Sequence, residues 1–304
     1  MKNWMTLVLA STVLVLSACG GGESTSPKPS VEPEPIRIEK RELQYGEHSY
    51  QRAVLYEPVN VQNPRQLIVW VHGGGWFAGK PDGDAPVFLD AYLKKGHPVF
   101  SIGYRLNEDG VFPNAEQDVL KVLHALEGDA CEKCETSEHW RKIQHWASQG
   151  YVLAGGSAGG SLALLGAGQL LTERQGQSAM RCAASFVGVL DVREIELYHP
   201  YAQSFIGDHL GKSLAPEKLA QLSVPHYVEN NLWSHLEKVR WAFGATRNDI
   251  LVPWATVKPV IELWKARGLD TIAEVIDGTP DGGHALSTDE ISHLLGALLE
   301  GCLQ

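Results

Sequence analysis

The stretch that decides the fold is Tyr151-Val152-Leu153-Ala154-Gly155-Gly156-Ser157-Ala158-Gly159, near the middle of a chain of 304 residues. It begins with apolar residues typical of a buried strand, and a run of small and apolar residues typical of a helix follows it at 160–165. A sharp strand-to-helix turn leaves no room for side chains two residues before and after Ser157, and glycine stands at both places. The pattern predicts a nucleophile elbow that lifts the Ser157 hydroxyl clear of the sheet.

A second glycine cluster lies upstream, where residues 67–71 read as a buried strand that runs into His72-Gly73-Gly74-Gly75-Trp76. A tetrahedral oxyanion needs two or three convergent donors, and glycines after a strand expose backbone N–H groups without hindrance. The candidate donors are Gly73, Gly74, Gly75 and, at the elbow, Ala158, and the sequence leaves open which glycines point inward. A flexible turn or a phosphate-binding loop is the alternative, but the spacing of a dinucleotide fingerprint is absent and no Gly-Lys-Ser/Thr follows.

With these motifs, the chain resembles the α/β-hydrolase superfamily, in particular esterases with a His-Gly-Gly-Gly motif: hormone-sensitive-lipase-like carboxylesterases and feruloyl- and acetyl-xylan-esterase-like proteins of bacteria. Tyr-Arg-Leu at 104–106 and Phe-Pro-x-x-x-x-Asp at 112–118 extend the resemblance. It implies an α/β-hydrolase fold, with a mostly parallel eight-stranded sheet between helices and an antiparallel edge at 37–45 and 51–56. Arg105 and Asp118 are expected to form either an ion pair beneath the site or a solvated surface pair.

A serine hydroxyl needs a base within hydrogen-bond reach, and this fold supplies its partners in the order Ser, Asp or Glu, His. We expect His284 to be the base, because it lies in a glycine-rich loop between a strand at 271–276 and the last helix. By the resemblance, His72 instead supports the glycine-rich loop at 72–76, which we call the oxyanion loop.

The orienting carboxylate should follow the penultimate strand, predicted at 239–245, and Asp249 matches that position in the family. Asp191, at the end of a strand predicted at 183–190, is the alternative. Asp277 and Asp281 flank His284 and are expected to be solvated loop residues.

The N-terminus reads as a lipoprotein signal peptide over 1–18: Lys2, an apolar run at 4–16, and Leu-Ser-Ala before Cys19. Cys19 would then carry the lipid (palmitate), with an ordinary secretory signal as the alternative. Gly20, by resemblance to lipoproteins, implies sorting to the outer membrane, facing the periplasm or the exterior. Residues 19–36, rich in Gly, Ser, Pro and Glu, are expected to form a flexible tether.

Residues 37–304 are expected to form one hydrolase domain, in which 192–236 is a small lid or pocket-wall insertion. The formal charge of −10 and pI near 5.6 argue against a nucleic-acid partner, and they leave membrane attachment to the lipid. The segment before residue 67 is too short for a large cap, which favours a small acyl group or an ester on a larger exposed substrate, such as a polysaccharide. Trp76 either lines the acyl pocket or simply packs.

The cysteines other than Cys19 lie in a compartment that favours oxidation. Cys131 and Cys134 are expected to form a local disulfide, with a zinc site that recruits His139 and His145 as the alternative. The remaining two, Cys182 and Cys302, either pair or stay free.

The expected function is a serine carboxylesterase, in which Ser157 attacks the ester, His284 transfers the proton and Asp249 orients the imidazole. An amide hydrolase, either a peptidase or an arylformamidase, is the first alternative, because such enzymes share the fold and the site. A non-catalytic surface-binding lipoprotein is the second. The mechanism requires no metal and no organic cofactor, and the oligomeric state is left open.

Overall fold

The computed structural model describes residues 34–131, 133–134 and 137–303. The predicted signal peptide, Cys19 and nearly all of the predicted tether therefore lie outside the described residues. Residues Pro35–Gln304 form one compact unit.

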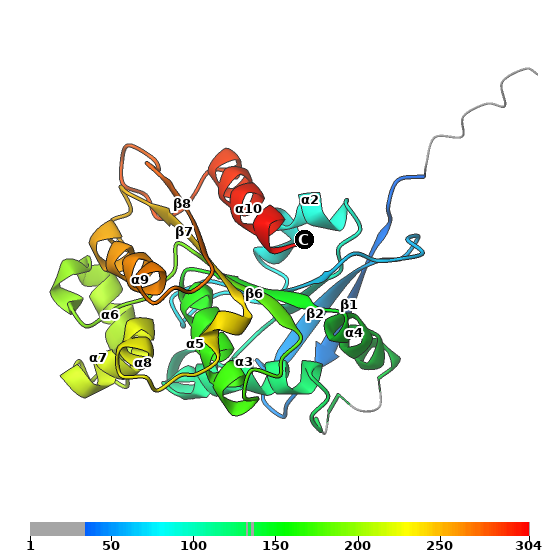
Figure 1. Cartoon of the computed structure of the whole chain (residues 1–304), viewed down its shortest axis with the longest axis horizontal. Helices are drawn as coiled ribbons and strands as arrows, with labels where there is room; N and C mark the ends of the chain where they lie inside the picture. The colour runs from blue at the N-terminus through cyan, green and yellow to red at the C-terminus, as the bar shows by residue number, and fades with distance from the viewer. Residues whose placement is uncertain (1–33, 132, 135–136, 304) are drawn as a thin grey trace, which may run out of the picture. The chain divides into compact units, whose positions relative to one another are not determined.

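An eight-stranded sheet runs through this unit in the order β1-β2-β4-β3-β5-β6-β7-β8 (Figure 1). The pairs β1·β2 and β2·β4 are antiparallel and all others are parallel, as the resemblance implies. The strands are β1 (Ile38–Gln44), β2 (Arg52–Pro58), β3 (Leu67–Val71), β4 (Val99–Ile102), β5 (Tyr151–Gly156), β6 (Met180–Phe186), β7 (Arg240–Thr246) and β8 (Thr271–Ile276).

The central strands are apolar throughout because helices cover both faces of the sheet. In β3, Val69 and its alternate neighbours belong to one core cluster, whereas Ile68 and Trp70 belong to the other. This division follows from the two-residue period of a strand. Parallel strands also end at the same edge, so the loops after β3, β5, β7 and β8 can meet there.

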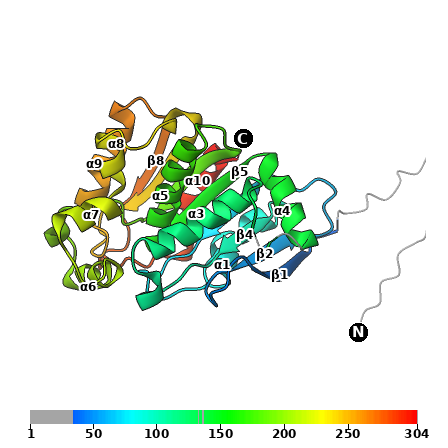
Figure 2. The same cartoon turned by 90° about the horizontal axis from the view of Figure 1, so that it is seen from below.

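The helices fall into two layers (Figures 1 and 2). One layer packs with the larger core cluster: α3 (Asn114–Leu126), α4 (Glu138–Ser148), α5 (Ala158–Glu173), α8 (Val224–Glu229) and α9 (Trp254–Ala266). The other packs with the smaller cluster: α1 (Ala85–Phe88), α2 (Asp90–Leu93) and α10 (Thr288–Cys302). The predicted insertion at 192–236 contains η2 (Ile195–Leu197), α6 (Pro200–His209), α7 (Pro216–Leu222) and α8.

The prediction of a strand over 183–190 is wrong at its C-terminal end. β6 stops at Phe186, and Val187 has a positive φ of 45°. The Val187 N–H still donates to the carbonyl of Gly244 on β7 (2.8 Å), but the positive φ of Val187 then turns the chain out of the sheet although its sequence stays apolar.

Two disulfides lie among the described residues. Cys131 is bonded to Cys134 as predicted, so these sulfurs are not available as zinc ligands. Cys182, on β6, is bonded to Cys302, at the end of α10. In the part of the chain that the structure describes, no group of His, Cys, Asp or Glu is arranged to hold a metal, and no helix is long and apolar enough to cross a membrane.

Candidate active site

The turn after β5 has the geometry of a nucleophile elbow. Ser157 has φ 53° and ψ −123°, a conformation that non-glycine residues rarely adopt. Its backbone N–H donates to the carbonyl of Phe186 (2.8 Å), which ties the turn to β6. A Cβ on Gly159 would lie 2.2 Å from the carbonyl oxygen of Val71, so the close approach of the elbow to β3 requires glycine.

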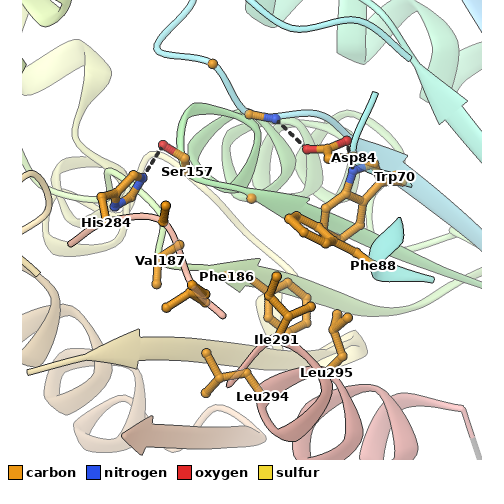
Figure 3. Close-up of a pocket in the computed structure, with 15 residues that line it drawn as sticks. Trp70, Asp84, Phe88, Ser157, Phe186, Val187, His284, Ile291, Leu294 and Leu295 are labelled. Carbon is orange, nitrogen blue, oxygen red and sulfur yellow. Dashed lines mark hydrogen bonds between the residues drawn. The ribbon is translucent and has the colours of Figure 1, made fainter. Parts of the chain in front are cut away.

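The structure brings the three predicted catalytic residues together. The Ser157 hydroxyl lies 2.9 Å from Nε2 of His284 (Figure 3), and Nδ1 of His284 lies 2.6 Å from Oδ2 of Asp249. The other oxygen of Asp249 accepts the backbone N–H groups of Leu251 and Val252, both at 2.9 Å. With its partners in place, the buried carboxylate orients the imidazole so that Nε2 can accept the serine proton.

The glycine loop after β3 lies beside the elbow, and buried side chains hold its peptide groups. His72 donates from Nδ1 to the carbonyl oxygen of Gly73 (2.7 Å), and its ring stacks on Tyr104 at 4.4 Å. The Tyr104 hydroxyl donates to the carbonyl oxygen of His72 (3.0 Å). Burial lowers the pKa of His72, so the imidazole stays neutral at neutral pH, and burial raises the pKa of Tyr104 well above its usual value.

These contacts indicate which glycine N–H groups are free. The C=O and N–H of a trans peptide point in opposite directions, so the bond to the Gly73 oxygen also sets the direction of the Gly74 N–H. The Gly74 oxygen accepts the N–H groups of Phe77 and Ala78 (3.1 and 2.9 Å), which sets the Gly75 N–H in the same way. Within the described residues, neither the Gly74 N–H nor the Gly75 N–H has an acceptor.

Gly73 differs from the next two glycines, because its N–H donates to Oδ2 of Asp84 (3.2 Å; Figure 3). The predicted donor Ala158 is the first residue of α5, where helix geometry leaves the backbone N–H without an intrahelical partner. Of the predicted donors, Gly74, Gly75 and Ala158 thus keep backbone N–H groups without an acceptor in the part of the chain that the structure describes.

A cavity of about 210 Å³ opens beside Ser157 between the oxyanion loop, α1 and α10. Its wall is apolar apart from Ser157, His284 and the carboxylate of Asp84. Its apolar lining includes Ala285 and Leu286. The other apolar side chains that line it are labelled in Figure 3: Trp70, Phe88, Phe186, Val187, Ile291, Leu294 and Leu295.

Trp76 does not line this cavity. Its buried ring stacks on His209 of α6 at 4.5 Å, and His209 in turn contacts Glu116 (2.9 Å). Trp76 instead borders a larger cavity of about 640 Å³, together with Gly75 and Phe205. The insertion therefore meets the oxyanion loop through α6, on a different side from the pocket beside Ser157.

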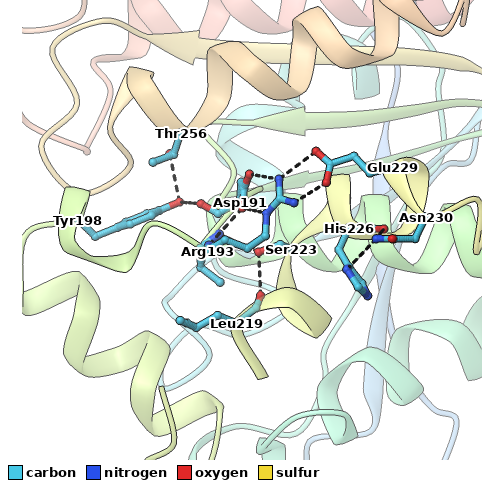
Figure 4. A network of polar contacts seen from close by, with 10 residues as sticks. Asp191, Arg193, Tyr198, Leu219, Ser223, His226, Glu229, Asn230 and Thr256 are labelled. Atoms are coloured by element: carbon cyan, nitrogen blue, oxygen red, sulfur yellow. Dashed lines mark hydrogen bonds and ion pairs between the residues drawn. The ribbon is translucent and has the colours of Figure 1, made fainter. Parts of the chain in front are cut away.

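Asp191, the alternative acid, serves another purpose. Its carboxylate pairs with Arg193 (2.7 Å), and Arg193 also pairs with Glu229 on α8 (Figure 4). The Tyr198 hydroxyl donates to the Asp191 backbone oxygen (2.7 Å) and lies 3.1 Å from the Thr256 hydroxyl. This network connects the insertion to α9. The carboxylate that binds His284 is that of Asp249.

The expected ion pair between Arg105 and Asp118 is present. Asp118 is buried and accepts Nε (2.9 Å) and Nη2 (2.8 Å) of Arg105, so the pair is bidentate. Asp281 lies on the surface, and Asp277 pairs there with Arg247 (3.2 Å).

Sequence reasoning missed Asp84. The residue precedes Ala85-Pro86 at the start of a helix, which is the ordinary signature of a helix cap, so its sequence gives no sign of a contact with Gly73. Tyr104 was marked only as part of a motif, without its bond to His72.

The fold and the site together define a protein of the α/β-hydrolase class. Comparison with protein-family models matches residues 54–233 to BD-FAE, and the chain belongs to this family of α/β-hydrolase esterases.

Individual curated relatives match shorter parts of the chain than the family model does. Ethyl acetate hydrolase of Pseudomonas putida is 28% identical over 132 residues, which cover 39% of this chain and 36% of that protein. Probable carboxylesterase 16 of Arabidopsis thaliana is 39% identical over 75 residues, which cover 23% of this chain and 17% of that protein. The chain spans 12% to 37% of the lengths of the curated relatives it matches.

Among solved structures, esterase B of Lactobacillus rhamnosis, inhibited by a tributyrin phosphonate, has the same fold with a TM-score of 0.65. It is 19% identical, and the match covers 88% of this chain and 84% of that one.

Proposed function

We propose that the protein is a serine carboxylesterase that cleaves esters with a short acyl group through an acyl-enzyme on Ser157. The observation that carries the proposal is the unbroken chain of contacts from the Ser157 hydroxyl through His284 to Asp249, at 2.9 and 2.6 Å. Family membership and the name of the Pseudomonas relative support an ester as the substrate.

In the first half of the reaction, the Ser157 oxygen attacks the ester carbonyl while His284 Nε2 takes the hydroxyl proton. The tetrahedral intermediate collapses, and His284 returns the proton to the departing alcohol. In the second half, water attacks the acyl-enzyme with His284 again as base, which releases the acid and restores Ser157. Asp249 stays ionised and stabilises the imidazolium that forms in each half.

The oxyanion would be bound by the N–H groups of Gly74, Gly75 and Ala158. None of the three has an acceptor among the described residues, and the helix dipole of α5 adds favourable charge at Ala158. Gly73, whose N–H is already bound by Asp84, is not part of this proposal.

The cavity beside Ser157 supports a small, apolar group on the substrate. Its volume of about 210 Å³ lies below the roughly 300–1,000 Å³ typical of pockets for drug-sized ligands. Because the cavity opens at the surface, the rest of the ester can extend to solvent, as it would with a polysaccharide-linked ester.

The test is turnover of p-nitrophenyl acetate, butyrate and decanoate by residues 37–304, with Ser157→Ala as the control. The proposal predicts hydrolysis of the short esters, a steep fall toward decanoate, and none in the alanine variant. Absence of turnover in folded wild-type protein would favour the non-catalytic binding lipoprotein.

An amide hydrolase is the second candidate, because the same three side chains can cleave an amide. Turnover of p-nitroacetanilide or N-formylkynurenine well above that of p-nitrophenyl acetate would replace the esterase with this alternative.

We further propose that Cys19 carries a lipid that anchors the enzyme to the outer membrane. Support comes from the apolar run and the Leu-Ser-Ala-Cys sequence alone. The intact mass of full-length protein from a membrane fraction should exceed that of the chain starting at Cys19 by the mass of the lipid, and Cys19→Ser should abolish the difference. A chain cleaved elsewhere without lipid would refute the anchor.

A further inference from the structure

Asp84 occupies a helix-capping position without capping its own helix. It is the N-cap residue of α1, yet its side chain makes no bond to that helix. Oδ1 instead accepts the indole N–H of Trp70 (2.9 Å), and Oδ2 accepts the N–H of Gly73 (3.2 Å), as Figure 3 shows. The carboxylate therefore joins β3 to the first peptide of the oxyanion loop.

The indole of Trp70 holds the Asp84 carboxylate in a fixed position. Its side chain is fully buried on β3, and its ring packs against Phe88 (5.8 Å) and Phe186 (6.0 Å). A carboxylate bonded to such a ring can move little, so it sets the position of the second group that it binds, the Gly73 N–H.

The peptide between His72 and Gly73 is consequently held at both ends. Tyr104 donates to its oxygen (3.0 Å), and Asp84 accepts from its N–H. A planar trans peptide held at both ends cannot rotate, so the next peptide, which carries the Gly74 N–H, begins from a fixed direction. Without Asp84, the bond from Tyr104 would hold only the oxygen end of this peptide, and the bond from His72 to the Gly73 oxygen would alone have to orient the Gly74 N–H.

We propose that Asp84 is a positioning residue for the oxyanion hole: by holding the Gly73 N–H it keeps Gly74 and Gly75 aimed at the oxyanion. This inference rests on the proposed function. Because the oxyanion exists only after attack, the bond from the Gly73 N–H to Asp84 acts on the transition state, whereas a direct contact of this pocket-lining carboxylate with substrate would act on KM. Loss of the bond to Gly73 should lower kcat and leave KM nearly unchanged.

The test is Asp84→Asn, which nearly conserves shape but can present only one carbonyl oxygen to two N–H donors. With p-nitrophenyl acetate, kcat per fluorophosphonate-reactive Ser157 should fall by about 10- to 10³-fold, up to the effect of one oxyanion donor. The affinity for a trifluoromethyl ketone, whose adduct carries the oxyanion, should fall by the same factor as kcat/KM.

The matched control is Asp82→Asn, on the same loop. Asp82 accepts from Lys40 (2.9 Å) and makes no contact with the Gly73 N–H, so kcat and the ketone affinity should stay at wild-type values. Trp70→Phe keeps the carboxylate but removes its anchor, and it should give a smaller fall in kcat than Asp84→Asn. Because Trp70 also lines the cavity, the ketone affinity of this variant must fall in step with kcat/KM, and that relation decides the question if Asp84→Asn does not fold.

Four results would overturn the positioning role of Asp84, and one would overturn the proposed function instead. Unchanged kcat in Asp84→Asn, or ketone affinity that does not follow kcat/KM, would overturn the inference, as would equal kcat in Trp70→Phe and wild type. A rise in kcat would also overturn it, since the charge of Asp84 would then oppose the oxyanion. If wild-type protein lacks Ser157-dependent turnover, the proposed function fails first.

Discussion

The oxyanion loop and the histidine loop lie at the same edge of the sheet, but they are held in different ways. In the first, buried side chains or backbone amides bind the carbonyl groups of His72, Gly73 and Gly74. In the second, residues 277–286 are largely exposed or half-buried. Within the described part of the chain, the imidazole of His284 has hydrogen-bond partners only in Asp249 and Ser157.

This difference matches what each loop would do in the proposed reaction. Donors to an oxyanion help most when they are already oriented before charge develops, which requires many fixed contacts. A base that accepts, holds and returns a proton needs one correct direction, which a single carboxylate can supply. The comparison predicts that single substitutions in the oxyanion loop lower kcat only in part. In the histidine loop, by contrast, kcat should depend mainly on one partner of His284, the carboxylate of Asp249.

The largest fall in kcat is expected at Ser157, which lies beside both loops. Ser157→Ala should lower kcat by about 10⁶-fold, as removal of a serine nucleophile does elsewhere. The temperature of thermal unfolding should change little, because among the described residues the hydroxyl bonds to His284 alone. Turnover of p-nitrophenyl butyrate checks this, and substantial residual activity in protein free of wild-type contamination would contradict it.

The next effect tests the dependence of the histidine loop on one partner. Asp249→Asn should lower kcat by about 10⁴-fold, because the amide favours the wrong imidazole tautomer. The Asn oxygen can still accept the N–H groups of Leu251 and Val252, so the fold should persist. If kcat fell less than about tenfold, other contacts would have to orient His284.

A matched glycine pair compares the two loops directly. Gly74 has φ +117°, and a Cβ there would lie 2.2 Å from the carbonyl of Ala78, so Gly74→Ala must displace the loop backbone. We expect kcat to fall by about 10²- to 10³-fold, the value of one donor.

Gly283, next to His284, is the control. Its Cβ would lie 3.1 Å from the Thr279 hydroxyl, a side-chain atom that can shift. Gly283→Ala should therefore cost less than about tenfold in kcat. Equal losses in the two variants would contradict the difference between the loops.

The smallest effect concerns pH. Burial lowers the pKa of His72 in the folded protein below its unfolded value of about 6.5. The unfolded chain thus binds more protons just below pH 6.5, and folding stability falls as pH drops from about 6.5 toward the lowered pKa. His72→Asn should lose less stability over this window, measured as Tm against pH. An equal slope in the variant would mean that His72 is not held neutral.

Much of this arrangement is predictable from the sequence because it depends on local pattern. The strands at 67–71 and 271–276 were predicted to the residue, since each is a run of strand-forming residues with a clear boundary. The elbow and the three proposed catalytic residues follow from the glycine spacing and the chain order of the resembling family.

The rest depends on contacts between distant segments, which periodicity does not reveal. The apolar run at 183–190 continues past the end of β6, because Val189 and Leu190 stay buried although the positive φ of Val187 has turned the chain out of the sheet. Asp84 has the sequence of a helix cap, but the buried indole of Trp70 and the Gly73 N–H bind its carboxylate.

The most direct test of the account is mass spectrometry of residues 37–304 after fluorophosphonate treatment, with turnover of p-nitrophenyl acetate recorded on the same samples. The account predicts a single adduct, on Ser157, that grows in step with the loss of turnover and is absent from Ser157→Ala and slow in His284→Ala. Turnover that persists in fully labelled protein, or an adduct on another residue, would contradict Ser157 as the nucleophile.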